Sequence, residues 1–541
     1  MNQAVVNEIQ RRRTFAIISH PDAGKTTLTE KLLLYGGALR LAGTVKSRKS
    51  KQHAVSDWME MEKQRGISVT SSVLQFEYQG SKLNILDTPG HQDFSEDTYR
   101  TLMAADSAVM LIDAAKGVES QTKKLFHVCR QRGIPIFTFI NKMDRDGQEP
   151  LDLLHEVEKV LNIKSYPMNW PIGRGREFMG IYDRATSRIE LFGRSGHGST
   201  IAPSRKGGPN DPAIVGSMSP PVYELLKEDV ELLDLAGDEF DAAMVARGEL
   251  TPVFFGSALT NFGVEAFLKS FIDLSLPPHE KNSSVGVIHP DQPEFSGFIF
   301  KIQANMDPAY RNRIAFLRIC SGVFNRGMVV KHVPTGKSIR LAQSKQFMAQ
   351  EATIIEEAYP GDIVGLVDAG LFGIGDTLTE TSDFAYEAIP KFPPEFFAQV
   401  HLRDAMKRKQ FVKGIEQLTN EGAVQRFRRP DIGLESPIVA AVGVLQFEVL
   451  EYRLTHEYGV DIRLEHLPYT LARWAVGKNL TARSLQRMDN LVLQDEDDNF
   501  VVLFNNQWAF DGEAERNDQV IYLAHSPVKG ASYAAKGASR L

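Results

Sequence analysis

The sequence has few cysteines, no long apolar run and no excess of positive charge. Cys129 and Cys320 are the two cysteines among 541 residues, too few and too distant for a disulfide framework or a zinc motif. The longest apolar stretches, such as 134–140, are far shorter than the roughly 20 residues of a membrane-spanning helix. The basic residues at 11–13 are not followed by the apolar region of a secretory signal. These absences predict a soluble, cytoplasmic protein that has no contact with a membrane.

The charge and the length of the chain exclude further classes of protein. The 62 basic residues are outnumbered by 68 acidic ones, so any nucleic-acid contact must come from a local patch rather than from the overall charge. Hydrophobic residues make up 43% and charged residues 24%, which is typical of a globular protein and excludes wholesale disorder. At roughly 150 residues per domain, the chain is expected to form three or four domains.

The first 280 residues alternate between strand-like and helical patterns. The β-branched run 14–19 predicts a buried strand, and a helix is expected to follow at 25–35. Such alternation favours a parallel sheet covered by helices on both faces. Further strands are predicted at 82–86, 107–112, 134–140 and 253–255, with a helix at 121–132.

The turn after the first strand matches the phosphate-binding loop, except that a serine replaces the leading glycine. A lysine at a helix N-terminus is unfavourable unless an anion binds there. Backbone N–H groups around Gly24 would cradle a phosphate, Lys25 would bridge the β and γ oxygens, and Thr26 would ligate magnesium. A plain strand–helix turn with a surface lysine is the alternative. The turn reads Ser19-His20-Pro21-Asp22-Ala23-Gly24-Lys25-Thr26.

Three further motifs follow in order, each at the end of an expected strand. The aspartate of the first can hold magnesium through water, and its glycine N–H can sense a γ-phosphate. The carboxylate that ends the second can accept both N1–H and N2–H₂ of guanine, whereas adenine offers neither donor there. The third could donate a backbone N–H to guanine O6. They read Asp87-Thr88-Pro89-Gly90-His91, Asn141-Lys142-Met143-Asp144 and Ser257-Ala258-Leu259.

Each motif alone would fit an ordinary turn or helix cap. Four motifs in this order, each at a strand end, predict instead a domain that binds GTP or GDP with Mg²⁺. The motifs resemble those of the translation-factor GTPases, which also share an Arg-Gly-Ile element in the first switch. Here that element is followed by Ser68, and the resemblance implies that its hydroxyl ligates magnesium, although Thr70 is close enough to be the ligand instead.

The resemblance has two more implications for the first domain. His91 is expected to place the attacking water, as a catalytic residue; whether it also removes the proton stays open. The basic segment 40–53 is expected either to lie near ribosomal RNA or to be a solvated loop. Residues 1–280 would form the GTP-binding domain, with an inserted subdomain at 145–252 similar to that of elongation factor G.

Within the insertion, a mobile loop is expected at 193–211, with helices at 220–236 and 239–247. Short strands separated by turn residues predict a β-barrel over 290–390. Residues 391–525 alternate between strand and helix, which predicts a ferredoxin-like split βαβ domain, and 526–541 is expected to be a flexible tail. The elements expected in that third domain are strands at 396–402, 437–442 and 460–465, helices at 409–420 and 444–458, and added strands over 491–509.

The third domain begins its first helix with a basic segment, 403–413, which is either a solvated face or a patch for RNA phosphates. The segments 256–263 and 442–454 resemble the class II GTPase peptide chain release factors within the translation-factor family. That resemblance implies a monomeric, ribosome-stimulated GTPase of translation termination. It would promote dissociation of the codon-reading release factors after peptide release, then hydrolyse GTP and leave.

Three other interpretations compete with this one. The first is a shortened or divergent elongation factor G, from which the chain differs because it ends before two further domains. The second is a metabolic GTPase such as the GTP-using subunit of sulfate adenylyltransferase, which lacks the insertion and the ferredoxin-like domain. The third is a P-loop kinase or ATPase, against which Asp144 argues, because adenine has no paired donors for this carboxylate.

Overall fold

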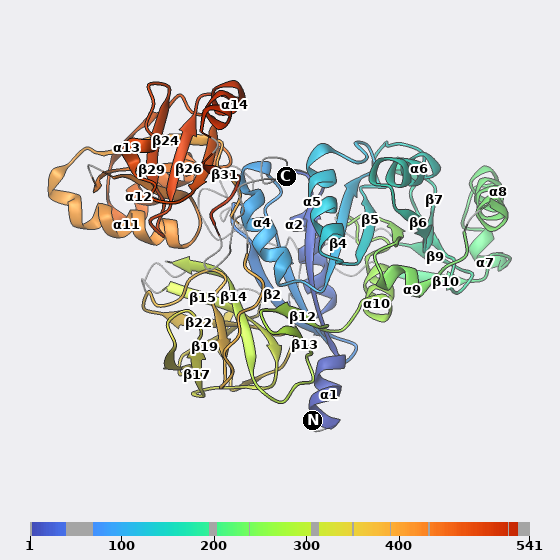
Figure 1. The fold of residues 1–541 in the computed structure, drawn as a ribbon. Helices are drawn as coiled ribbons and strands as arrows, with labels where there is room; N and C mark the ends of the chain where they lie inside the picture. The colour runs from blue at the N-terminus through green and yellow to red at the C-terminus, as the bar shows by residue number, and fades with distance from the viewer. Residues whose placement is uncertain are drawn as a thin grey trace.

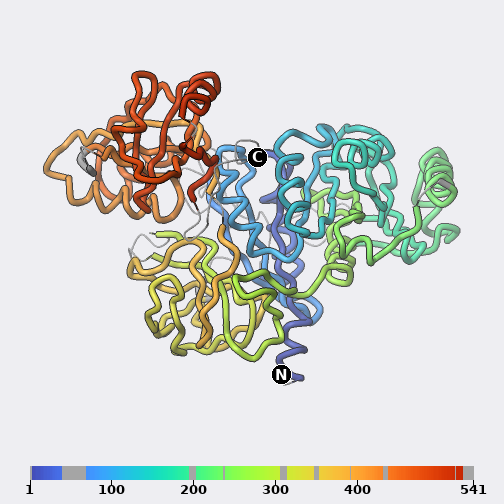
Figure 2. Tube along the Cα trace, in the orientation of Figure 1, coloured from blue at the N-terminus to red at the C-terminus, as the bar shows by residue number. Residues whose placement is uncertain are grey.

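The structure is a computed structural model, and it forms three domains with an inserted subdomain on the first (Figure 1, Figure 2). The first domain is blue to green, the barrel domain beneath it is yellow-green, and the third domain is orange to red. Ser68, the basic segment 40–53 and most of the expected tail lie outside the described residues. The structure describes residues 3–38, 69–193, 203–236, 238–304, 313–348, 351–389, 391–430, 433–517 and 519–527.

A seven-stranded sheet in the order β2-β3-β1-β4-β5-β11-β6 forms the centre of the first domain. The sheet is mixed rather than wholly parallel, because β2 runs antiparallel to β3. The turn between them, Gln79-Gly80, has two positive φ angles, the geometry that joins antiparallel strands most tightly. The strands are β1 (Arg12–Ser19), β2 (Ser72–Tyr78), β3 (Ser81–Asp87), β4 (Ser107–Asp113), β5 (Ile136–Asn141), β6 (Lys164–Pro167) and β11 (Leu250–Phe255).

Helices cover both faces of this sheet, which explains why its central strands are apolar throughout. On β1, Phe15 and Ile17 pack in one core cluster, while Ala16 and Ile18 pack in another. No described helix has the length and hydropathy needed to cross a membrane. The helices are α1 (Gln3–Gln10), α2 (Lys25–Tyr35), α4 (Ser95–Met103), α5 (Ser120–Gln131), α6 (Pro150–Leu161) and α10 (Val264–Leu274), with a 3₁₀ turn, η1, at Gln92–Phe94.

The inserted subdomain contains a four-stranded antiparallel sheet. Its last strand corrects the expectation of a mobile loop over 193–211 for residues 203–211, whereas 194–202 lie outside the described residues. Residues 204–207 form a strand, β10, paired with β9, and Asp211 caps the next helix by accepting the Ala213 N–H at 2.9 Å. Helix α9 is shorter than expected because Asp241 caps it. The elements are β7 (Asn169–Ile172), β8 (Gly180–Asp183), β9 (Arg188–Phe192), β10 (Ser204–Gly207), η2 (Gly175–Glu177), α7 (Pro212–Val215), α8 (Pro220–Ala236) and α9 (Ala242–Ala246).

The expected barrel is present as an eight-stranded antiparallel sheet in the order β18-β17-β23-β14-β15-β22-β19-β20. Its interior is apolar and includes Ile299, Leu317 and Val364. Its strands are β14 (Ser296–Ala304), β15 (Arg313–Ser321), β17 (Val329–His332), β18 (Lys337–Arg340), β19 (Ser344–Met348), β20 (Glu351–Ile354), β22 (Ile363–Asp368) and β23 (Thr377–Thr379), and two smaller pairs are β12 (Lys281–Ser283) with β13 (Gly286–Ile288) and β16 (Phe324–Asn325) with β21 (Glu357–Ala358).

The third domain holds two successive βαββαβ units. The first has the order β27-β24-β26-β25, and the second, β29-β30-β28-β31, repeats the same topology in reverse. They join where β25 pairs with β29. The expectation missed β25, and the expected strands over 491–509 end in a helix, α14. The elements are β24 (Phe396–Leu402), η4 (Ala405–Lys407), α11 (Arg408–Asn420), β25 (Gln425–Arg429), β26 (Gly433–Ala441), α12 (Leu445–Tyr458), β27 (Ile462–His466), β28 (Leu471–Val476), α13 (Ala482–Leu485), β29 (Asn490–Gln494), β30 (Phe500–Phe504), α14 (Gln507–Arg516) and β31 (Ile521–Leu523).

Buried ion pairs join the first domain to the barrel. Asp362 of the barrel is fully buried and pairs with Arg12 at 2.8 Å and Lys82 at 3.2 Å. Arg318 of the barrel pairs with Asp106 at 2.5 Å, and both side chains are buried. Burial raises the pKa of Asp362, but Lys82 and Arg12 outweigh it and hold the pKa below its usual range. The carboxylate therefore stays ionised at neutral pH.

We expect Asp362→Ala to lower the free energy of unfolding by about 3–5 kcal/mol, because the buried Arg12 and the partly buried Lys82 both lose this carboxylate and Arg12 keeps only its pair with Glu8. Chemical denaturation measures this. The depressed pKa means that the contribution of Asp362 is present above the unfolded-state pKa of about 4 and is lost as the pH falls through the lower folded-state value. The difference between parent and variant should therefore shrink in acid. As a control, Glu249→Ala removes an exposed pair and should change little; equal effects of the two variants would contradict the prediction.

Candidate functional site

The four sequence motifs meet at one edge of the central sheet. Strands β1, β3, β5 and β11 lie in the same sheet, and β1, β5 and β11 are parallel to their neighbours. The motifs begin at or just after the ends of these strands, at Ser19, Asp87, Asn141 and Phe255. In open α/β sheets, ligands bind outside the carboxyl ends of the strands. Residues more than 200 positions apart in sequence thus share one site.

The phosphate-binding loop requires glycine at position 24 for two reasons. Its φ of 97° is in the left-handed region at the N-terminus of α2, and a Cβ there would lie 2.4 Å from Asn141 Nδ2. The loop ends in Lys25, whose Nζ lies 2.5 Å from Asp87 Oδ1 with both side chains buried. Thr26 follows in the first helical turn. This arrangement directs backbone N–H groups, a cation and a carboxylate to one point.

Asn141 ties the phosphate-binding loop to two other loops. Its side chain is buried; Nδ2 donates to Ala23 O at 2.8 Å, and Oδ1 accepts the Ala258 N–H at 2.8 Å. Its neighbour Lys142 extends in the same direction, donating to Asp22 O at 2.5 Å and pairing with Asp113 at 2.7 Å. The motif at 141–144 thus fixes the phosphate-binding loop relative to the motif at 257–259.

A buried acceptor is left over at Asp144. Its Oδ1 is inaccessible to solvent and has no hydrogen-bond partner among the described residues. Leaving such an atom unpaired costs about 1–3 kcal/mol, so it marks a place where a ligand donor fits. In the facing loop, the Ser257 N–H donates to Phe262 O at 2.9 Å and the Ala258 N–H is held by Asn141. In that motif, the N–H of Leu259 is the one for which no described residue is a hydrogen-bond acceptor.

The motif at 87–91 lies over the phosphate-binding loop. Thr88 Oγ1 donates to Ile17 O at 2.7 Å, Pro89 O accepts from Thr98 Oγ1 at 3.3 Å, and a Cβ at Gly90 would lie 3.5 Å from Pro21 Cα, at van der Waals distance. His91 follows with its side chain 32% exposed. Its Nδ1 accepts the Asp93 N–H at 3.3 Å.

The oxygens near Lys25 suit a hard divalent cation. Thr26 and Asp87 supply hydroxyl and carboxylate oxygens, the ligands that Mg²⁺ prefers together with phosphates and water. Met143 supplies no such oxygen from its side chain; it is buried and donates its N–H to Gly256 O at 3.2 Å. The third expected metal ligand, Ser68, is outside the described residues, so its place stays a prediction.

Asp113 was not identified from sequence as a contributor to the site, whereas His20 was predicted as part of the phosphate-binding loop. Asp113 is the last residue of β4, which lies between β1 and β5. Burial raises the pKa of Asp113, but the hydrogen bond from Lys142 outweighs burial and holds the pKa below its usual range. His20 is buried 2.7 Å from Glu119, and burial lowers its pKa. The rule that strand ends carry the site would have found Asp113, because it applies to β4 as to its neighbours.

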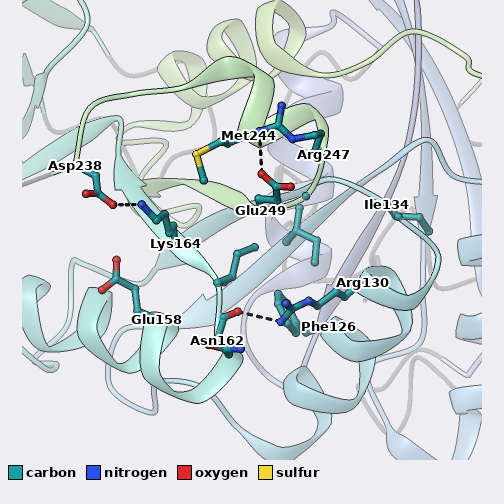
Figure 3. Close-up of a pocket in the computed structure, with 14 residues that line it drawn as sticks. Phe126, Arg130, Ile134, Glu158, Asn162, Lys164, Asp238, Met244, Arg247 and Glu249 are labelled. Atoms are coloured by element: carbon teal, nitrogen blue, oxygen red, sulfur yellow. Dashed lines mark hydrogen bonds and ion pairs between the residues drawn. The ribbon is translucent and has the colours of Figure 1, made fainter.

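A separate hollow of about 720 Å³ lies at the opposite edge of the sheet, between α5, α6 and the start of β11 (Figure 3). Four of its charged groups pair with one another: Lys164 with Asp238 at 3.0 Å and Arg247 with Glu249 at 2.9 Å. None of the four motifs contributes to it. The motif residues, not this hollow, form the candidate site.

Three family models match the chain. The model described as "Elongation factor Tu GTP binding domain" matches residues 10–277, and "Elongation factor G domain 2" matches 294–381. The model described as "Class II release factor RF3, C-terminal domain" matches 386–513. The matches agree with the order of the three domains in the structure.

Curated relatives named "Peptide chain release factor 3" align over nearly the whole chain. The protein from Symbiobacterium thermophilum is 56% identical over 526 residues, covering 97% of this chain and 100% of its own. The proteins from Microcystis aeruginosa and Gloeobacter violaceus are 56% and 54% identical, covering 96% and 97% of this chain and 96% and 100% of their own. The chain belongs to the peptide chain release factor 3 family. This membership confirms the expected resemblance to the release factors. It favours that interpretation over a divergent elongation factor G.

A crystal structure of a protein from Thermus thermophilus shares the fold, with a TM-score of 0.67 over 91% of this chain and 72% of that one. Its sequence is 21% identical, so the likeness concerns the fold alone. Together with the matched families, it confirms the predicted fold class: a P-loop domain, a translation-factor barrel and an α+β third domain.

Proposed function

We propose that this protein is a GTPase of translation termination that acts on the ribosome. The observation that carries the proposal is the convergence of four guanine-nucleotide motifs in a member of the peptide chain release factor 3 family. Asn141 ties three of them together, and Lys25 links the phosphate-binding loop to Asp87 of the fourth. The chain would bind the ribosome after peptide release as a cytoplasmic monomer, promote dissociation of the codon-reading release factors, hydrolyse GTP to GDP and leave.

The nucleotide would lie along the carboxyl edge of the sheet. Residues 19–26 would surround the phosphates, and Lys25 would turn from Asp87 toward the β and γ oxygens. Asp144 would accept two guanine donors, and the Leu259 N–H would be available to O6. Mg²⁺, when bound, neutralises charge that develops on the transferred phosphate. Thr26 and Asp87, with Ser68, would hold it.

His91 would act at the γ-phosphate, where the motif over the phosphate-binding loop brings it near. A histidine can orient a water through either ring nitrogen. Because Nδ1 is engaged by Asp93, Nε2 is the nitrogen left to contact that water.

The direct test of this function uses ribosomes halted at a stop codon with a labelled codon-reading release factor bound. Adding the pure protein with GTP should accelerate release-factor dissociation, whereas omitting the protein should not. If the protein instead promotes transfer-RNA translocation and leaves release-factor dissociation unchanged, the function is that of an elongation factor and the proposal is wrong.

The choice of base is tested at Asp144. Asp144→Asn presents one acceptor and one donor, so one guanine contact becomes a clash of donors and affinity for GTP should fall by a few kcal/mol. Xanthine carries a carbonyl where guanine has its amino group, so xanthosine triphosphate should bind relatively better. Titration with both nucleotides measures the switch, and unchanged GTP affinity would remove Asp144 from the base site.

The role of His91 is tested by separating binding from chemistry. His91→Ala should leave nucleotide binding nearly intact, because the ground state is held elsewhere, and slow hydrolysis by about 10²–10⁴-fold. The variant should support one round of release-factor dissociation and then fail at multiple turnover, since GTP binding suffices for dissociation and hydrolysis is needed for departure. Normal turnover would contradict the catalytic role; failure in the first round would show that hydrolysis drives dissociation.

The basic segment at the start of α11 would contact RNA phosphates. Helix α11 buries Phe411 and Ile415. Lys409 and Lys413 on this helix are exposed, and so is Arg403, which precedes η4. Lys407 is different because its Nζ donates to Gly459 O. The outward face therefore carries cations that the domain itself does not bury.

Replacing Arg403, Lys409 and Lys413 with glutamate reverses three charges and should weaken ribosome binding. The slope of the logarithm of the binding constant against the logarithm of the salt concentration should become shallower by about one unit for each phosphate that the protein no longer contacts. Replacing the same three with glutamine should give an intermediate slope. Binding assays over a salt series measure both, and GTP affinity of the free protein serves as the control. A parental slope in the glutamate variant would identify the segment as a solvated face.

A further inference from the structure

Asp93 contacts the catalytic histidine and the third domain at the same time. Its Oδ1 lies 3.2 Å from His91 Nδ1, and its N–H donates to that nitrogen at 3.3 Å. Its other oxygen, Oδ2, accepts the Leu445 N–H at 2.9 Å. Leu445 is the first residue of α12 and lies 352 positions after Asp93 along the chain. One carboxylate thus joins two domains beside the reacting group.

The third domain is shaped to receive this carboxylate. Gly443 packs so closely on Asp93 that a Cβ on the glycine would lie 2.1 Å from Asp93 Cγ. The Gly443 loop is itself fixed, because Gln446 Oε1 accepts the N–H groups of Val442 at 2.8 Å and Gly443 at 3.1 Å. The close contact between Asp93 and the third domain therefore depends on a rigid loop that tolerates no side chain at position 443.

An apolar contact surrounds the same junction. Phe94 packs with Val69 and with Val449 of α12 in a small buried cluster. Among the described residues, none of these three side chains hydrogen-bonds to the carboxylate, whereas Leu445, whose N–H binds Oδ2, packs against the cluster with its side chain. The cluster offers a way to perturb the interface separately from the hydrogen bond of Asp93.

The geometry has a consequence for His91. An imidazole bound at one nitrogen has its ring plane and its free nitrogen fixed, and misplacement by about 1 Å can cost 10²-fold in rate. His91 Nδ1 either accepts the Asp93 N–H or, when it carries a proton, donates to Oδ1. Because Oδ2 is held by α12, the position of Oδ1 beside Nδ1 depends on where the third domain docks. Docking and ring orientation are therefore mechanically linked.

We propose that Asp93 is a positioning residue that couples docking of the third domain to the orientation of His91. The coupling rests on the proposed role of His91 in hydrolysis. When α12 holds the carboxylate as in this structure, the ring takes one orientation. When the third domain shifts, Asp93 is released and the ring reorients. Movement of a distant domain on the ribosome is thereby transmitted to the hydrolytic site.

The test perturbs the link from each side. Asp93→Ala removes the carboxylate from the first domain, and Gly443→Ala displaces it from the third domain. Asp93→Asn retains an oxygen for Leu445 and a polar group toward His91, so it serves as the conservative variant. Val449→Ala trims the apolar contact and is the matched interface control.

Two measurements are made on each full-length variant. The Cε1–H signal of His91 is followed by NMR in the GDP-bound protein and is assigned as the signal missing from His91→Ala. GTP hydrolysis on ribosomes is measured in a single turnover. Asp93→Ala and Gly443→Ala should both move the His91 signal and slow hydrolysis by about 10–100-fold, with GDP affinity unchanged as evidence of folding. Asp93→Asn should recover most of the rate, and Val449→Ala should leave the signal in place.

If Gly443→Ala leaves the signal and the rate at parental values, the third domain does not act through Asp93 and the coupling is wrong. If Val449→Ala moves the signal as far as Gly443→Ala does, the carboxylate is not the specific link and the proposal is again wrong. If His91→Ala itself hydrolyses GTP normally, the role of His91 fails, whereas the NMR comparison still reports on the coupling.

Discussion

The site depends on one side chain, the buried amide of Asn141, which hydrogen-bonds to Ala23 on one side and Ala258 on the other. An amide has both a donor and an acceptor, and here each is used to hold a different loop. The tight fit of Gly24 against Nδ2 shows that the phosphate-binding loop is built around this group. The loops that would meet phosphate and base are thus positioned before a nucleotide arrives, which lowers the entropy cost of binding.

The two interfaces of the first domain differ in kind. The barrel is joined by buried ion pairs centred on Asp362 and Asp106, and separating them would expose ionised groups that need their partners. The third domain is joined through Asp93, Phe94 and the Arg100–Gly422 contact, all from the segment that follows the motif at 87–91. The first interface favours a rigid pair of domains. The second joins the third domain to the segment that follows the motif proposed to contact the γ-phosphate.

Much of the fold followed from local sequence, and the departures have identifiable causes. The helices at 25–35 and 220–236 and the strand at 396–402 have the predicted bounds. The missed strand β25 reads QRFRR, in which a single buried residue, Phe427, gives too little apolar alternation to mark a strand. It forms because β26 pairs with it on one side. The repeat of the βαββαβ unit could not be predicted for a related reason: the topology is repeated without a repeated sequence pattern.

Local sequence was enough to predict the residues of the proposed site, because phosphate, base and magnesium contacts need particular residues at fixed distances within each loop. Gly24, Lys25, Asp87 and Asp144 could therefore be predicted as site residues. The groups that connect those loops and domains become apparent only once the chain is folded. The pairing of Lys142 with Asp113, the pairing of Asp362 with Lys82, and the contact of Asp93 with Leu445 join segments that are remote along the chain. Such contacts depend on how sheets and domains pack, and no local spacing encodes them.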